Sequence, residues 1–143
     1  MVYANRSAKD VAGATQLDSV EAVASVADVL GAATPGGPAT RHLIGAGVFD
    51  AMQAHALFVN ISRGDVVDEA ALIAALQSGK IGGAGLDVYE LEPQVPEALL
   101  AMENVVLLPH LGTNTLEVRT SMGMMALDNL QAFAAGQALP NPV

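Results

Sequence analysis

The stretch ALFVNISRGDVVDEAALIAALQ, residues 56–77, contains the pattern that decides the fold. Its first part, Ala56–Ile61, is a short apolar run that predicts a buried strand. Asp68–Gln77 then predicts a helix, because Asp68 and Glu69 place acidic side chains at the positive end of the helix dipole. A strand followed closely by a helix is the repeating unit of a parallel α/β sheet.

The same alternation of short apolar runs and longer amphipathic segments continues along the whole chain. It predicts an open, doubly wound α/β sheet of the Rossmann-like type, whose ligands bind beyond the carboxyl ends of the strands. The further strands are predicted at Met1–Ala4, Asp28–Thr34, Gly82–Val88 and Asn104–Pro109, and the further helices at Ser19–Ala27, Ile44–Met52 and Thr115–Ala135.

Composition narrows the classes of partner. The 143 residues, 52 % hydrophobic and 15 % charged, suit one compact core. A formal charge of −9 argues against binding to nucleic acid or to an anionic membrane. The chain has no cysteine, so it has no disulfides or cysteine-based metal sites, and it shows no signal sequence or membrane-length apolar stretch. We therefore expect a soluble cytoplasmic protein.

Arg63 follows the predicted strand Ala56–Ile61 and directly precedes a glycine. Its planar guanidinium suits bidentate binding of a ligand carboxylate. Alternatively, Arg63 is a surface residue paired with Asp65 or Asp68. The local sequence leaves both interpretations open.

His110 follows the predicted strand Asn104–Pro109. A histidine titrates near neutral pH, so at this position it suits a proton donor to a carbonyl oxygen, although a lone histidine is more often structural. Glu92 precedes Pro93, which predicts extended backbone. Its carboxylate suits an imidazole partner, and the alternative is an exposed acidic loop.

Arg63, Glu92 and His110 together would form a site for reducing a 2-keto acid without a metal. The arginine would hold the substrate carboxylate, the histidine would protonate the carbonyl oxygen as hydride arrives, and the glutamate would orient the histidine. The other two histidines, His42 and His55, are interpreted as structural.

Asn5, Arg6 and Ser7 follow the first predicted strand, where a dinucleotide-binding fold recognises the ribose 2′ position. An arginine without an accompanying acid suits the 2′-phosphate of NADP, and the alternative is a solvated turn. Asp87 ends a glycine-rich strand and is either a turn residue or a cofactor contact.

Three segments resemble one family: ATPGGPATRHLI (33–44), NISRGDVVDEAALIAALQSGKIGGAGLDVYELEP (60–93) and NVVLLPHLGTNT (104–115). They are similar to the D-isomer-specific 2-hydroxyacid dehydrogenases, especially the glyoxylate/hydroxypyruvate reductase branch. The resemblance implies NADPH-dependent reduction of a small 2-keto acid to the 2-hydroxy acid, with NAD a poorer cofactor, by a homodimer. It implies catalytic roles for Arg63, Glu92 and His110. It implies cofactor contacts from Thr34, Pro35, Ile61, Asp87 and Gly112, besides Asn5, Arg6 and Ser7.

Relative to that family, the chain corresponds to a C-terminal portion. We expect residues 1–143 to form a partial dinucleotide-binding domain that lacks the first βα unit, with 113–143 as its C-terminal helix and tail. The N-terminal substrate domain is expected to be absent. The alternative function is a non-catalytic fragment that serves as a dimerisation or nucleotide-binding module.

Overall fold

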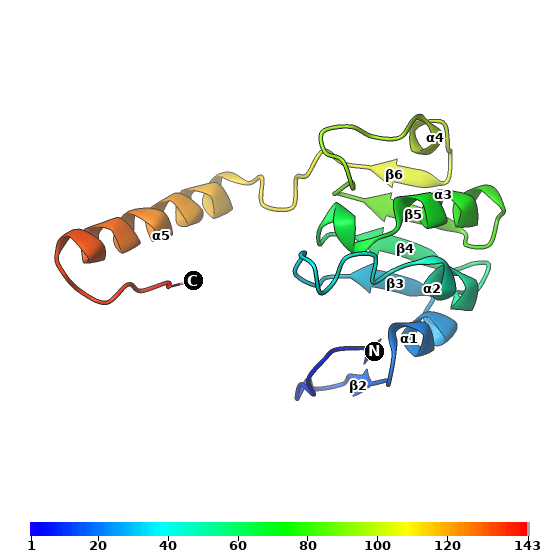
Figure 1. Ribbon diagram of the computed structural model, residues 1–143, viewed down its shortest axis with the longest axis horizontal. Helices are drawn as coiled ribbons and strands as arrows, with labels where there is room; N and C mark the ends of the chain where they lie inside the picture. Colours follow the sequence, from blue (N-terminus) through cyan, green and yellow to red (C-terminus); the bar gives the residue numbers. More distant parts are fainter. Residues whose placement is uncertain (143) are drawn as a thin grey trace. The chain divides into compact units, whose positions relative to one another are not determined.

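The structure is a computed structural model that describes residues 1–142. It divides into two compact units, Met1–Pro109 and His110–Val143. In chain order, the elements of the first unit (Figure 1) are β1 (Val2–Tyr3), β2 (Thr15–Gln16), α1 (Val20–Val26), β3 (Val29–Ala32), α2 (Ala46–Ala51), β4 (Leu57–Asn60), the 3-10 helix η1 (Gly64–Val66), α3 (Glu69–Gln77), β5 (Gly83–Leu86), α4 (Glu97–Leu100) and β6 (Val105–Leu107). The second unit contains α5 (Leu116–Ala134).

The main sheet has four parallel strands in the order β3-β4-β5-β6. Its register pairs Ala32 with Asn60, and Asn60 with Leu86, which pairs in turn with Leu107. The carboxyl ends of all four strands therefore lie along one edge. This arrangement confirms the predicted Rossmann-type α/β fold.

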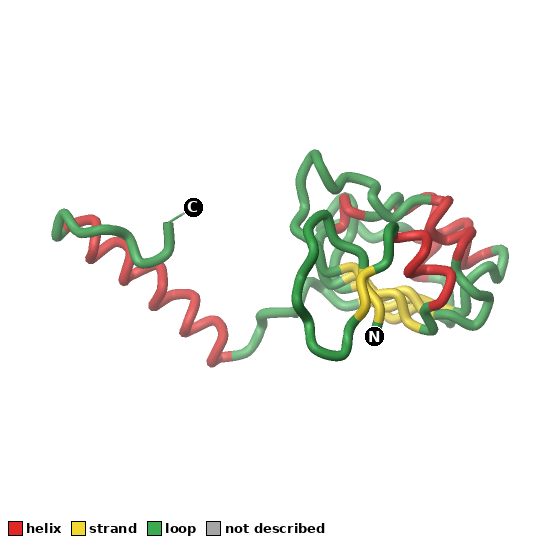
Figure 2. The backbone as a smooth tube through the Cα atoms, turned by 90° about the horizontal axis from the view of Figure 1, so that it is seen from below, coloured by secondary structure: helices red, strands yellow, loops and turns green. Residues whose placement is uncertain are grey.

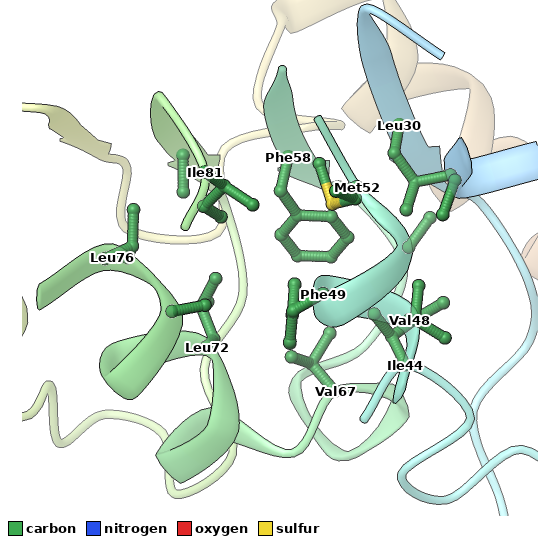
Figure 3. Packing of buried hydrophobic residues seen from close by; sticks show 14 of the residues in the cluster. Leu30, Ile44, Val48, Phe49, Met52, Phe58, Val67, Leu72, Leu76 and Ile81 are labelled. Carbon is green, nitrogen blue, oxygen red and sulfur yellow. The ribbon is translucent and has the colours of Figure 1, made fainter. Parts of the chain in front are cut away.

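Helices α1, α2 and α3 pack on one face of this sheet and enclose the core with it (Figure 2). Phe58 of β4 is fully buried and meets Phe49 of α2 edge to face, with ring centroids 5.4 Å apart. Leu72 and Leu76 of α3 and Leu30 of β3 contribute to the same cluster (Figure 3). Burial of these side chains supplies the main favourable free energy of folding.

The opposite face of the main sheet is open over much of its width. Val29, Leu57 and Val106 expose 58 %, 46 % and 65 % of their surface. A parallel sheet is usually covered by helices on both faces. Within the first unit, the core lies on the other face of the sheet, to which Leu30 and Phe58 contribute.

Several short elements were not predicted. The strand β1 pairs with β2, which the sequence did not indicate, and the two form a parallel sheet separate from the main one. The helices η1 and α4 were also missed. Elements of two to four residues are too short to show a hydrophobic period.

Helix α2 begins at Ala46, two residues later than predicted. The predicted first residue, Ile44, forms a parallel bridge with Val67 instead. Its N–H donates to Val66 O at 3.0 Å, and its carbonyl accepts from Asp68 N at 2.9 Å. Because the N–H and carbonyl groups of Ile44 bond to another segment, the helix begins after this residue. Hydrophobic periodicity does not reveal such bonds between segments.

Helix starts elsewhere follow the sequence. The side chains of Ser19, Asp68 and Thr115 cap α1, α3 and α5 by accepting from backbone N–H groups in the first turn. Asp68 accepts from Ala71 N at 3.0 Å, as its place before an apolar period predicts.

The second unit consists of α5 and its flanking segments. Gly136 follows the helix with a left-handed φ of 67°, and its N–H donates to Phe133 O at 3.1 Å, so the predicted stop is confirmed. Throughout residues 1–142, no helix combines the length and the apolar character needed to cross a membrane.

Candidate functional site

A cavity of about 620 Å³ lies at the carboxyl ends of β3 and β4. It brings together four of the predicted site residues from two segments of the chain: Thr34 and Pro35 after β3, and Ile61 and Arg63 after β4. The remaining lining residues are Ala33, Gly36, Gly37, Ser62 and Asp65. A site at this edge is expected of a parallel α/β sheet.

Arg63 is exposed, and its Nη1 donates to the carbonyl oxygen of Ser62 at 2.7 Å. Within the part of the chain that the structure describes, it forms no ion pair with Asp65 or Asp68. Asp68 caps α3 instead. The structure therefore does not show the surface ion pair that the sequence left open, and the carboxylate-binding role of Arg63 stays a prediction.

Glu92 is linked to the Arg63 loop through the backbone. Gly64 packs so closely on the Tyr89–Glu90 peptide that a side chain on Gly64 would overlap it. The N–H of Tyr89 donates to Glu92 Oε1 at 3.1 Å. The close contact at Gly64 therefore holds the loop after β4, which carries Arg63, against the segment after β5, which carries Glu92.

Glu92 lies in a turn. Residues 90–93 form a turn, the peptide bond from Glu92 to Pro93 is cis, and Gln94 N donates to Leu91 O at 2.9 Å. The hydrogen bond from Gln94 N and the contact of Glu92 Oε1 with Tyr89 N hold this turn together.

A cluster of charged side chains joins the loop after β3 to the Glu92 turn. Glu90 Oε1 accepts from Arg41 Nη2 at 2.9 Å and lies 2.8 Å from His42 Nε2. The hydrogen bond with His42 holds the pKa of Glu90 below its usual value. Burial raises the pKa of Glu69, whose Oε1 accepts from Glu90 N at 3.3 Å. His42 has a left-handed φ of 52°, so this contact anchors an uncommon backbone conformation.

His55, the other histidine interpreted as structural, lies 2.8 Å from Asp28 through Nε2. Both side chains are largely exposed, at 62 % and 86 %. Such an exposed pair contributes little to stability.

Tyr89 lies at the carboxyl ends of β5 and β6. Its hydroxyl oxygen lies 2.9 Å from the carbonyl oxygen of Leu108 and 3.2 Å from that of Leu86, so its single proton is shared between these two acceptors. Burial raises the pKa of this phenol. Asp87, also buried, donates its backbone N–H to Asn60 O at 3.1 Å, which places it beside the end of β4.

The remaining predicted residues lie outside the cavity lining. Asn5, Arg6 and Ser7 form an exposed loop after β1, in which Asn5 Nδ2 donates to Ser7 O at 3.0 Å. His110 and Gly112 belong to the second unit. His110 adopts a left-handed φ of 55°.

Sequence reasoning missed three residues that shape the site: Asn60, Gly36 and Gly64. Asn60 is a polar residue in an apolar strand, which is a usable signal, because a buried amide needs several partners. The two glycines carry no such signal, since only the neighbouring segments show why a side chain would not fit.

The described residues contain no group of three or more histidine, aspartate or glutamate side chains placed to hold a metal ion.

Residues 1–112 match the model of the NAD-binding domain of D-isomer-specific 2-hydroxyacid dehydrogenases. The chain belongs to this family. It is 46 % identical over 141 residues to a hydroxyphenylpyruvate reductase of Plectranthus scutellarioides, covering 99 % of this chain and 45 % of that protein. It is 43 % identical, with the same coverage, to a glyoxylate/hydroxypyruvate reductase of Arabidopsis thaliana.

Solved structures agree with this assignment. The NADPH-dependent glyoxylate/hydroxypyruvate reductase of Sinorhizobium meliloti, crystallised with NADP and malonate, aligns with a TM-score of 0.96 and 39 % identity. The alignment covers 99 % of this chain and 44 % of that one. The holo form of Rhodotorula graminis D-mandelate dehydrogenase aligns with a TM-score of 0.94 and 36 % identity, over 99 % and 43 % of the two chains. This chain therefore spans less than half the length of these relatives.

Proposed function

We propose that this chain supplies the nucleotide-binding domain and the catalytic side chains of an NADPH-dependent reductase for small 2-keto acids of the glyoxylate or hydroxypyruvate type. The observation that supports this most directly is the cavity at the carboxyl edge of the sheet, into whose lining Arg63 enters without an ion-pair partner among the described residues. Family membership and the reductases among the relatives support it further.

The residues at this edge fit a dinucleotide. The cavity has the size of an ordinary small-molecule site, and Thr34, Pro35 and Ile61 line it where a nicotinamide would bind in a Rossmann-type fold. Asp87, beside the end of β4, and Gly112 are proposed as further cofactor contacts. When bound, the cofactor supplies the hydride.

We propose that the loop after β1 binds the 2′-phosphate of NADPH. Arg6 would form charge-assisted hydrogen bonds with the 2′-phosphate, and Asn5 and Ser7 would supply neutral donors beside it. The exposure of this loop suits a phosphate on the outer end of the nucleotide. The Sinorhizobium meliloti reductase, which was crystallised with NADP, supports the choice of NADPH.

The proposed chemistry of the side chains is acid–base and electrostatic. Arg63 binds the substrate carboxylate and orients its carbonyl group. His110 donates a proton to the carbonyl oxygen as that oxygen gains charge, so the product is a 2-hydroxy acid. Glu92 orients His110 and stabilises its protonated form. The proton that His110 gives up in each turnover is replaced from solvent.

The experiment measures the loss of NADPH absorbance with glyoxylate or hydroxypyruvate, for this chain and for any longer polypeptide that its gene encodes. We expect His110→Ala to abolish turnover, whereas His55→Ala, at an exposed histidine outside the cavity lining, leaves the rate intact. Retention of the rate by His110→Ala would overturn the proposal. Tight NADPH binding with no turnover in either form would favour the nucleotide-binding module.

We also propose that the protein acts as a homodimer in the cytoplasm. The homodimer rests on the family resemblance, and the absence of cysteine suits a reducing compartment. Light scattering coupled to size-exclusion chromatography measures the mass of the protein in solution directly. A monomer at micromolar concentration would contradict the proposed homodimer.

A further inference from the structure

Asn60 and Gly36 contact Arg63 from two different segments of the chain. We propose that they are positioning residues: Asn60 sets the backbone of Arg63, and Gly36 leaves the space through which its side chain reaches the cavity. This inference rests on the proposed function, in which the Arg63 guanidinium binds the substrate carboxylate.

Asn60 is the last residue of β4 and is only 1 % exposed. Its Oδ1 accepts from both Ser62 N, at 3.0 Å, and Ser62 Oγ, at 2.7 Å. Its Nδ2 donates to Arg63 O at 3.1 Å. One buried amide therefore holds the peptide unit before Ser62 and the peptide unit after Arg63.

These hydrogen bonds continue to the guanidinium. The carbonyl oxygen of Ser62 accepts from Arg63 Nη1 at 2.7 Å. Because Asn60 fixes the N–H and hydroxyl of Ser62, it also fixes the orientation of the residue that carries this carbonyl. The amide of Asn60 thus influences the head group of Arg63 as well as its backbone.

Gly36 bounds the Arg63 side chain from the loop after β3. A Cβ atom on Gly36 would lie 2.8 Å from Arg63 Cγ, 3.0 Å from Arg63 Cβ and 3.1 Å from Asp65 Oδ1. The two carbon atoms are close to the backbone, so they cannot move away as the tip of a flexible side chain can. A methyl group at position 36 would therefore redirect the whole side chain of Arg63.

A guanidinium held in this way loses less conformational freedom on binding a carboxylate than a free arginine would. Bidentate binding also depends on the direction of the planar group, so a small displacement has a large effect. Asn60 and Gly36 are expected to act on the keto acid through Arg63, without touching it themselves.

The test measures the Kd of glyoxylate in the presence of NADP⁺, which carries no hydride to deliver, so the carbonyl group is not reduced during the measurement. We expect Asn60→Ala and Gly36→Ala each to raise this Kd about tenfold to a hundredfold, the loss typical of a displaced binding group. Gly47→Ala is the matched control, since it adds the same methyl group at an exposed glycine with open space around it. It should leave the Kd unchanged.

A double-mutant cycle with Arg63→Ala separates positioning from general damage to the fold. If the two residues act through Arg63, Asn60→Ala and Gly36→Ala have no further effect on the glyoxylate Kd once Arg63 is removed. Additive losses in that background would overturn the inference. If Asn60→Ala does not fold, Gly36→Ala, on an exposed loop, decides alone.

The outcomes also distinguish this inference from the proposed function. If the unaltered protein does not bind glyoxylate, or if Arg63→Ala leaves the Kd unchanged, the proposed role of Arg63 fails and the positioning role fails with it. If Arg63→Ala weakens binding and neither Asn60→Ala nor Gly36→Ala does, only the positioning role fails.

Discussion

Gly64 and Tyr89 meet backbone to backbone: a Cβ atom on Gly64 would overlap the carbonyl group of Tyr89. Gly64 follows Arg63, and Tyr89 N donates to Glu92 Oε1. This single contact therefore joins the segments that carry two of the proposed catalytic residues. It leaves no room for any side chain at position 64.

Gly64→Ala should destabilise the protein by at least about 2 kcal/mol, because neither backbone can move aside without disturbing the sheet. Urea denaturation followed by circular dichroism measures the change. Gly47→Ala, in α2 with open space around it, is the control and should be neutral or stabilising by about 0.5–1 kcal/mol. Equal effects of the two substitutions would contradict the close contact.

Phe58→Ala should cost about 3–5 kcal/mol, since Phe58 is fully buried and packs edge to face on Phe49. Phe133→Ala on α5 is the matched control, because Phe133 is 76 % exposed. Its cost should stay within about 0.5 kcal/mol. A comparable loss for both in thermal or chemical denaturation would show that the core has been assigned wrongly.

Glu90→Gln should change the pH dependence of stability. His42, and then Arg41, hold the pKa of Glu90 below its usual value of 4.5, so ionised Glu90 stabilises the folded protein above that value. The contribution is lost as the pH falls through the lowered pKa. The variant should therefore be less stable than the unaltered protein near about pH 6, with the difference shrinking towards about pH 3.

Glu103→Gln, at an exposed glutamate, serves as the control for this measurement. Its difference from the unaltered protein should be small at every pH. A Glu90→Gln difference that grows as the pH falls would have the wrong sign and would rule out the stabilising role of ionised Glu90.

Arg6→Ala should weaken NADPH binding about tenfold or more while changing NADH binding little, because only NADPH carries the 2′-phosphate. Fluorescence titration with each cofactor measures both constants. Arg119→Ala, which removes the same charge from α5, controls for the overall electrostatic field. Equal losses for the two cofactors with Arg6→Ala would exclude the proposed phosphate contact.

Some of the site could be predicted from single segments. Arg63 and His110 each follow an apolar strand, and Asp68 precedes a helical period and caps it. Parallel strands end at one edge, so Thr34 and Arg63 could be expected near each other, and the cavity brings them together. The roles of Arg63, Glu92 and His110 remain predictions for the kinetic experiments.

Other features could not be predicted, because they depend on segments far apart in the chain. Glu90 and His42 are 48 residues apart and share a hydrogen bond. The pairing of β1 with β2 and the start of α2 were missed for the same reason.

The sequence by itself determined the alternation of strands and helices, the parallel sheet and the starts of α1, α3 and α5, because hydrophobic period and capping chemistry act over a few residues. Only the tertiary structure decided that Asn60 holds the Arg63 loop, that a side chain at position 36 would press on Arg63 and that position 64 has no room for one. Those requirements come from the volume and hydrogen-bonding groups of neighbouring segments, which meet only when the chain has folded.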